Sequence, residues 1–297
     1  MPNTLAHIGI NGLITKSIFR KSDLLWIYAG CIIPDFPWII RKVVETILPS
    51  VNGYELQAFV IVEATLFFSI ILSLALAVLS KFPVRTFLIL SLGSLLHLLL
   101  DPIQYKWANG VHLFAPFNWD LIQYGFFWPE SFGTYLLTFI GIIFFIYNWK
   151  EVKNSKPDLI FSQKRIIVFL FLLLIYFSLP IYFMKNVEKT DNHFISTLKN
   201  YENRTGKYVE MDRKKVKFNE TTNSFWIESF DHDLIELQNV ENISSSKLSI
   251  QGKFVNNSLI NVTNYHENWV LFRDGASYAG IAIILFAWLI QFRDKKN

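Results

Sequence analysis

The sequence predicts a mainly α-helical protein: a polytopic membrane helical bundle of about seven segments, with a small β-rich extracytoplasmic domain inserted before the last helix. The chain of 297 residues is 52% hydrophobic and has a mean hydropathy of +0.31. Several apolar runs approach the roughly 18 to 20 residues that a helix needs to cross a bilayer. Between residues 185 and 273 the pattern changes to short segments of β-branched and aromatic residues separated by Asn, Ser, Asp and Gly, which is typical of strands and turns.

The apolar runs define the helical part of the chain. The first run is short for a full crossing, and the sixth is interrupted by Pro180, a residue that kinks helices. The expected membrane segments are residues 4–19, 24–40, 59–79, 84–101, 132–149, 166–184 and 276–292.

The polar insert is expected to form a partial sandwich or a barrel, with a helix near residues 192–201 before it. Its three histidines are scattered, and solvated surface is the simpler interpretation of them than a metal site. They are His193, His232 and His266. The expected strands are 214–218, 224–230, 234–240, 247–255 and 259–262. The predicted domains are therefore a bundle at 1–184, an outer domain at 185–273, and a last helix with its tail at 274–297.

Basic residues predict the orientation, because short cytoplasmic loops are enriched in Lys and Arg. If every run spans, the short loops on one side hold most of the Lys and Arg residues of the short loops, and the short loops on the other side hold only Arg41, Lys42 and Lys106. The N-terminus and residues 185–273 are then outside and the C-terminus is cytoplasmic. The residues on the cytoplasmic side are Lys16, Arg20, Lys21, Lys81, Arg85, Lys150, Lys153, Lys156, Lys164, Arg165, Arg293, Lys295 and Lys296.

Charge and cysteine content exclude two further classes. The formal charge of +4 is modest and is not gathered on one basic face, so nucleic-acid binding is not expected. Cys31 is the only cysteine, so the chain forms no intrachain disulfide.

An H-x-x-x-D pair, His97 and Asp101, closes the fourth apolar run. Residues four apart lie on one face of a helix, so the imidazole and the carboxylate can converge on one point. Pro102 biases Asp101 away from helical geometry, which places the pair at the last turn, near a membrane surface. The pair is either part of a metal site or a satisfied hydrogen-bonded pair within the membrane.

The predicted orientation brings ionisable residues from four segments to one depth, at their outer ends. A charged group at the membrane centre costs about 2.5 kcal/mol or more, and such residues by default mark a functional site. Carboxylates close together raise one another's pKa unless a cation lies between them. A mixed His and carboxylate set without a thiolate suits zinc or manganese. The expected ligands of a divalent, zinc-like ion are His7, Asp35, Glu63, His97 and Asp101.

Three of these residues also have simpler interpretations. His7 could be an interfacial polar residue. Asp35 could cap or turn the chain at a segment end. Glu63 could lie at the water interface near a helix N-terminus, where a carboxylate is favoured.

Catalysis at such a site would use a water whose pKa the metal lowers toward neutrality. Glu63 or Asp101 would serve as general base, since sequence does not separate a ligand from a base. His112 lies in the aromatic, Pro-punctuated stretch after the pair. It is a candidate ligand or general acid or base, and its simpler interpretation is a polar loop residue.

Four features occur in an order and spacing found in a known family: His7, Pro34-Asp35, His97-Leu-Leu-Leu-Asp101 and Gly110-Val-His-Leu-Phe-Ala-Pro-Phe117. With these the sequence resembles the membrane-bound metal-dependent hydrolases known as LexA-binding, inner-membrane-associated hydrolases, which look like distant relatives of zinc-dependent phospholipase C. The resemblance covers residues 1–150 and implies a metal-dependent hydrolase in a bacterial-type inner membrane.

One departure from that family concerns its H-R-G-x-T-H-S stretch. Val62-Glu63-Ala-Thr65-Leu-Phe-Phe-Ser69 stands at the expected place. Either Glu63 replaces a His ligand, with Thr65 and Ser69 remaining from the polar set, or the site has lost a second metal or its activity.

The resulting hypothesis is a membrane-embedded hydrolase that acts on a lipid-linked ester or phosphoester through a metal-activated water, with the aromatic loop at 105–128 admitting the head group. The alternative is a non-catalytic membrane protein whose cluster is a structural metal site or a polar cluster and whose outer domain binds a protein partner. A transporter is a third class. The ionisable groups lie at the outer edge rather than the midplane, and the two halves show no paired broken helices, which disfavours a transporter.

Overall fold

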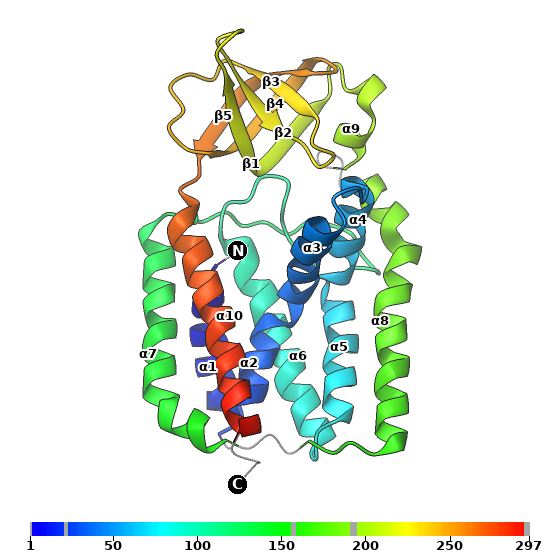
Figure 1. Cartoon of the computed structure of the whole chain (residues 1–297), viewed down its shortest axis with the longest axis vertical. Coiled ribbons are helices and arrows are strands. Elements are labelled where there is room, and N and C mark those ends of the chain that lie inside the picture. Colours follow the sequence, from blue (N-terminus) through cyan, green and yellow to red (C-terminus); the bar gives the residue numbers. More distant parts are fainter. Residues whose placement is uncertain (1, 21–22, 156–158, 191–194, 294–297) are drawn as a thin grey trace.

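Long helices lie side by side beneath a small β barrel (Figure 1). The computed structural model describes residues 2–20, 23–155, 159–190 and 195–293. The helices of the bundle are α1 (Thr4–Ile18), α2 (Leu24–Ile32), α3 (Phe36–Ile47), α4 (Gly53–Glu63), α5 (Leu66–Val78), α6 (Pro83–Leu100), α7 (Phe132–Asn154), α8 (Gln163–Thr190) and α10 (Val270–Arg293). Short 3-10 helices extend two of them, η1 (Ile33–Asp35) after α2 and η2 (Asp101–Ile103) after α6.

The helical class is confirmed, and the number of membrane segments is not. Within the described residues, five helices are long and apolar enough to cross a membrane, or six if a bent pair counts as one span. These are Leu24–Ile47, Pro83–Ile103, Phe132–Asn154, Gln163–Thr190 and Leu271–Gln291, with Gly53–Glu63 and Leu66–Val78 as the bent pair. Helix α1 has 15 residues, which at 1.5 Å per residue is about 22 Å, less than the roughly 30 Å of a hydrocarbon core.

The third expected segment, 59–79, is not one straight helix. Helices α4 and α5 meet at an angle of 69°. The break occurs at Thr65, whose φ of −82° and ψ of 166° are extended rather than helical. Helix α4 also begins earlier than expected, because the side chain of Asn52 accepts a hydrogen bond from the amide of Glu55 at 2.9 Å and caps the helix.

Glycine determines how closely α1 approaches α7. A Cβ added to Gly141 would lie 1.9 Å from the carbonyl oxygen of Leu5, and one added to Gly9 would lie 2.6 Å from Gly141. No residue with a side chain fits between the two backbones. The same end of α1 is held by Asn3, whose side chain accepts from the amide of Ala6 at 3.0 Å. Helix α1 therefore has a fixed position within the bundle, which places the residues of its first turns.

The polar insert forms a closed five-stranded barrel. Its strands are β1 (Tyr208–Asn219), β2 (Ser224–Glu228), β3 (Leu234–Gln238), β4 (Lys247–Asn256) and β5 (Leu259–Glu267). They follow each other around the barrel in the order β1-β2-β3-β5-β4, with β3 and β5 parallel and the other neighbours antiparallel. Alternate side chains fill the interior, as the period of a strand requires. They include Val209, Met211, Ile227, Ile235, Ile250 and Ile260.

The segment before the barrel differs from the expected helix near 192–201. Helix α8 continues to Thr190, and the structure then has a four-residue helix α9 (Ser196–Lys199) and a 3-10 turn η3 (Tyr201–Asn203). The beginning of the expected helix, with His193, lies outside the described residues.

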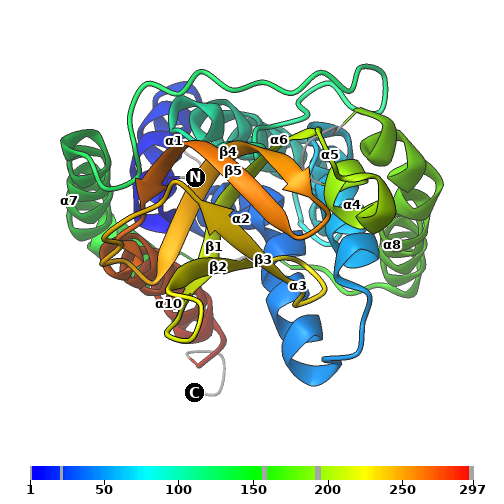
Figure 2. The same cartoon turned by 90° about the horizontal axis from the view of Figure 1, so that it is seen from above.

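The connection from α6 to α7, residues 104–131, lies between the bundle and the barrel (Figure 1). Seen from above, it follows one side of the molecule, with α7 and α8 at opposite edges (Figure 2). Its two arms are paired near their base, where the amide of Tyr105 donates to the carbonyl of Phe127 at 2.9 Å. This connection forms part of the candidate site.

Candidate metal centre

Two histidines and an aspartate from different parts of the chain meet under the barrel. His7 lies in the first turns of α1, His97 in the last turn of α6 and Asp101 at the start of η2. Their ligand atoms all lie within 4.8 Å of one another. The exposed fractions are 0% for both histidines and 3% for the aspartate. This group, whose members were each expected from sequence, could hold a metal ion.

The separations within the group are close to those of a metal coordination shell. His7 Nε2 lies 3.4 Å from Asp101 Oδ1, and His97 Nε2 lies 3.7 Å from Asp101 Oδ2. Ligand atoms at about 2.0 to 2.1 Å from a tetrahedral zinc ion lie roughly 3.3 Å from each other. Among the described residues, Asp101 Oδ1 and the Nε2 atoms of both histidines have no hydrogen-bond partner. Buried polar atoms without partners are costly unless water or an ion satisfies them.

The tautomer of His97 is determined by the backbone of α2. Its Nδ1 lies 2.6 Å from the carbonyl oxygen of Cys31, and because a carbonyl only accepts, Nδ1 must donate. In the neutral ring Nε2 then carries a lone pair. A carbonyl on the far nitrogen is the usual way in which proteins orient a metal-binding histidine.

The charged groups around His97 favour a positive charge at its Nε2 atom. This atom faces two carboxylates, Asp35 Oδ1 at 3.5 Å and Asp101 Oδ2 at 3.7 Å. A lone pair between two carboxylates is repulsive, and the repulsion is strong where water is excluded. A proton on Nε2 or a cation beside it removes the repulsion.

The rings of His7 and His97 are stacked, which limits how both could bind one ion. Their centroids are 3.7 Å apart and their planes differ by 3°. A metal lies close to the plane of an imidazole ligand, so two parallel rings do not share an ion unless one of them turns. His97 is held by Cys31, whereas neither ring nitrogen of His7 has a hydrogen-bond partner among the described residues. The donor set therefore fits a single ion on the condition that the ring of His7 turns out of the stack.

Asp35 lies at the edge of the cluster. It lies in the 3-10 turn η1 between α2 and α3, as the simpler interpretation allows, and its side chain makes no capping hydrogen bond to α3. Its contact is with His97, and its side chain is 17% exposed. The carboxylate is therefore placed to compensate charge on His97 or to reach an ion from the solvent side.

Glu63 is not brought into the cluster. It is the last residue of α4, so it does not lie at a helix N-terminus, and it is buried. Its neighbour is the hydroxyl of Tyr176 on α8. The break at Thr65 separates it from α5, and the group of possible ligands does not include it.

His112 and Asp101 line the same pocket, which has a volume of about 40 Å³, enough for a small number of water molecules. Nδ1 of His112 lies 2.8 Å from the carbonyl of Trp119 and must donate to it. Burial lowers the pKa of His112, against the smaller opposing effects of Trp119 and Asp120. The imidazole is therefore neutral at pH 7, with Nε2 as its acceptor.

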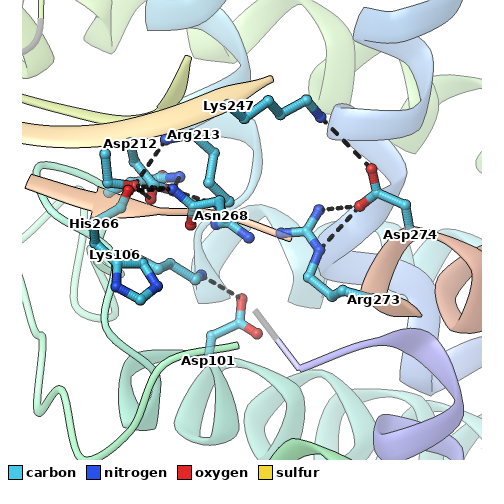
Figure 3. Close-up of polar contacts among 11 residues, drawn as sticks. Asp101, Lys106, Asp212, Arg213, Lys247, His266, Asn268, Arg273 and Asp274 are labelled. Carbon is cyan, nitrogen blue, oxygen red and sulfur yellow. Dashed lines mark hydrogen bonds and ion pairs between the residues drawn. The ribbon is translucent and has the colours of Figure 1, made fainter. Parts of the chain in front are cut away.

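Lys106 is the residue that sequence analysis did not associate with the site. Its side chain is 2% exposed, and Nζ lies 3.7 Å from Asp101 Oδ2 (Figure 3). It also lines the pocket beside His112. One feature of the sequence could have indicated its role, since Lys106 is the only Lys or Arg between Asp101 and Ser131.

The remaining described histidines are on the barrel and do not belong to the group. His232 is exposed and pairs with Glu228. His266 stacks on Trp128 with ring centroids 3.7 Å apart, and its Nε2 lies 3.3 Å from Glu130.

Comparison of the chain with protein-family models, with curated proteins and with solved structures finds no match. The fold and the site define a class of protein in physical terms. It is a bundle of helices, several of them apolar enough to span a membrane, that carries a separate β barrel and a buried His–His–Asp group.

Proposed function

We propose that the chain is a membrane-embedded, metal-dependent hydrolase that acts on a lipid-linked ester or phosphoester. The observation that supports this most is the position of His97 Nε2, which faces two carboxylates without a hydrogen-bond partner. A divalent cation there would satisfy His97, Asp101 and His7 together. The resemblance to inner-membrane hydrolases, drawn from the same residues, points in the same direction.

His7, His97 and Asp101 would hold the ion, with Asp35 beside them. A bound zinc-like ion supplies one kind of chemistry, a water whose pKa is lowered enough to act as a nucleophile near neutral pH. His112 is neutral, and its free Nε2 is suited to take or return a proton at the leaving group. Lys106 would bind an anionic oxygen of the substrate.

The pocket is lined by both apolar and polar side chains, as a site for an amphiphilic substrate would be. Its volume of about 40 Å³ holds a small number of water molecules, so the pocket would have to widen to admit the ester or phosphoester of a lipid-linked substrate. The apolar lining residues include Pro34, Trp38, Ile61, Leu98, Val111 and Leu121, and the polar ones are Asp101, Lys106, Asn109 and His112.

The test of this function is turnover by the purified full chain in lipid nanodiscs. A chromogenic phosphodiester and a chromogenic lipid ester should be hydrolysed, and chelation should abolish hydrolysis until zinc or manganese is added back. Asp101→Asn should be inactive under all these conditions, and Glu236→Gln, on the outer surface of the barrel, should match the wild type. Hydrolysis that is indifferent to chelation, or absent with every metal, would argue against the proposal.

A second candidate is a non-catalytic membrane protein with a polar cluster in place of a metal. A proton on His97 Nε2 satisfies the same two carboxylates, and Lys106 already provides a positive charge near Asp101. In this case the barrel would carry the function by binding a protein partner. Metal analysis separates the candidates, because the polar cluster predicts no bound ion after purification in metal-containing buffer.

We further propose a bacterial-type inner membrane, with the N-terminus and the barrel outside and the C-terminus in the cytoplasm. The ends of α1, α5 and α7 and the starts of α2, α6 and α8 lie at the end of the bundle away from the barrel (Figure 1). Lys and Arg residues at these helix ends are among those that the positive-inside rule assigns to the cytoplasm; they are Lys16, Arg85, Lys150, Lys153, Lys164 and Arg165.

A further inference from the structure

The barrel is attached to the connection that contributes Lys106, Asn109 and His112 to the lining of the pocket. On one arm, residues 108 and 109 contact strand β1, and on the other arm Trp128 and Glu130 contact His266 of β5. Figure 3 shows Lys106 reaching from the first arm toward Asp101, with Asp212 and Arg213 of β1 above it. The barrel thus contacts the segment that carries Lys106 into the site.

That segment is a tight turn with a strained residue. The amide of Asn109 donates to the carbonyl of Lys106 at 3.2 Å and closes the turn. Ala108 has a φ of +54°, a left-handed conformation that costs a residue with a Cβ roughly 1 kcal/mol or more. Such a conformation persists where the surroundings hold it.

Glu210 of β1 holds this strained residue. Its Oε2 accepts a hydrogen bond from the amide of Ala108 at 2.7 Å. Its Oε1 accepts from the hydroxyl of Tyr208 at 2.8 Å and from the side-chain amide of Gln251 at 2.7 Å. The carboxylate is therefore immobilised from the barrel side and presents one oxygen to the turn.

Asp212 makes a second contact through a β-bulge. The register between β1 and β4 shifts between Met211 and Lys214, and Arg213 has a φ of +48°. A bulge redirects side chains, and here Asp212 Oδ2 accepts a hydrogen bond from Asn109 Nδ2 at 3.4 Å. Burial alone would raise the pKa of Asp212, but the Arg213 guanidinium and Lys106 hold it below its usual range. Asp212 is therefore ionised and faces the segment of Lys106.

A lysine side chain has many rotamers, and holding one of them against a carboxylate costs up to about 2 kcal/mol in entropy. An ammonium at 3.7 Å from Asp101 and 2% exposed therefore needs a backbone that does not move. The barrel supplies two carboxylates to this turn, from Glu210 to the amide of Ala108 and from Asp212 to the side chain of Asn109.

We propose that Glu210 and Asp212 of the barrel are positioning residues that hold the 106–109 turn so that Lys106 lies against Asp101. The outer domain then completes the site in the bundle rather than serving a remote partner alone. The inference rests on the proposed function only for the role of Lys106 in binding substrate. The placement of Lys106 can be measured independently, without turnover or metal.

The placement is tested by amine labelling of the full chain in nanodiscs, followed by peptide mass spectrometry. Lys106 should be protected, and Glu210→Ala should raise its labelling rate at least about tenfold by opening the turn locally. The exposed Lys215 and Lys217 report on the rest of the barrel and should not change. Glu210→Gln keeps an acceptor oxygen and should keep most of the protection.

A rescue variant separates positioning from general damage to the barrel. Glycine adopts positive φ without the cost of a Cβ, so Ala108→Gly added to Glu210→Ala should restore the protection of Lys106. Damage to the barrel would not be repaired by a substitution in the turn. Equal labelling of Lys106 and Lys215 in the wild type, or no change in Glu210→Ala, would overturn the proposal.

Metal affinity supplies a second measurement. Lys106 competes with a cation for Asp101, so Lys106→Met should bind zinc several-fold more tightly than the wild type. Asp212→Ala should also raise the zinc affinity of the otherwise wild-type chain. Added to Lys106→Met it should raise the affinity no further, since both substitutions act through the contact of Lys106 with Asp101. Independent effects would contradict positioning. A chain that binds no metal refutes the metal centre, and the labelling result still decides the positioning.

Discussion

His7 and His97 stack face to face with ring centroids 3.7 Å apart and planes within 3°. Two histidines from α1 and α6 thus share a buried site in which His97 is held by the carbonyl of Cys31 and His7 is not held at either nitrogen by any described residue. One ion can bind both rings if His7 turns. His97 is therefore the fixed ring of the pair.

Removing the fixed ligand should abolish metal binding. We expect His97→Ala to lower zinc affinity at least about tenfold, equivalent to about 1.4 kcal/mol, because the remaining atoms do not complete a site. Metal content is measured on purified protein by mass spectrometry. His232→Ala is the matched control, since His232 is exposed on the barrel. Equal metal content in the two variants would point to binding elsewhere.

Glu63→Gln should leave the metal content at the wild-type value. Glu63 neighbours Tyr176 on α8 and is not among the residues whose ligand atoms converge. Mass spectrometry of the metal content of the purified variant tests this expectation. Asp101→Asn is the comparison variant, which should lose the ion. Loss of metal in Glu63→Gln would restore Glu63 as a ligand, as the sequence hypothesis had it.

Gly141→Ala should lower the melting temperature and the metal content together. Its Cβ would lie 1.9 Å from the carbonyl oxygen of Leu5, so α1 must move away from α7 and carry His7 with it. Overpacking of this kind costs about 1 to 3 kcal/mol. Gly275→Ala, on α10 with nothing within 4 Å of the new Cβ, should not be destabilised. Thermal unfolding followed by tryptophan fluorescence measures both, and equal melting temperatures would be unexpected.

Stability should fall as the pH falls below about 6.5, the ordinary pKa of histidine, in part because of His112. Burial lowers the pKa of His112 in the folded chain, so as the pH falls the unfolded chain binds a proton before the folded chain does. The contribution of neutral His112 to the free energy of unfolding is therefore lost as the pH falls from about 6.5 toward the pKa of His112 in the folded chain. Above pH 6.5 both states are neutral and the contribution is complete. Replacing His112 by Asn should flatten the melting temperature between pH 7 and 5. Asp212, whose pKa is also lowered, loses its contribution only below about pH 4. An unchanged pH slope in His112→Asn would contradict this assignment.

Orientation is measured by cysteine accessibility, because the single native Cys31 is buried. A cysteine at Lys215 on the barrel should react with an impermeant maleimide on intact cells. A cysteine at Lys164, at the start of α8, should react only after the membrane is opened. The reverse pattern would place the barrel in the cytoplasm.

Local patterns predicted most of the elements. The apolar runs lie largely in helix, and each of the five expected strands overlaps one observed strand. Their bounds differ, because β1 begins six residues earlier than expected and β5 ends five residues later, whereas β2 and β3 each end two residues earlier. The pair His97 and Asp101 converges because four residues make one helical turn, which is a local property. The bend at Thr65 was not predictable, since the apolar run continues through it and the run carries no Pro or Gly there.

The composition of the site was predicted less completely. His7, His97 and Asp101 meet as expected, whereas Glu63 lies beside Tyr176 and Lys106 enters the cluster. A lysine in a loop usually indicates solvent, because nothing in its neighbours along the chain shows that it will be buried. Glu210 and Asp212 gave no sequence signal at all, because their role depends on a bulge and on a turn about a hundred residues earlier.

The sequence by itself determined which segments are apolar enough for helices, which alternate as strands, and which residue types could bind a cation, since these follow from solvation and from the periods of helix and strand. The tertiary structure decided which residues from different segments meet. The stacking of His7 on His97, the turn that brings Lys106 to Asp101 and the barrel that holds it depend on packing between distant segments, and local periodicity carries no information about such contacts.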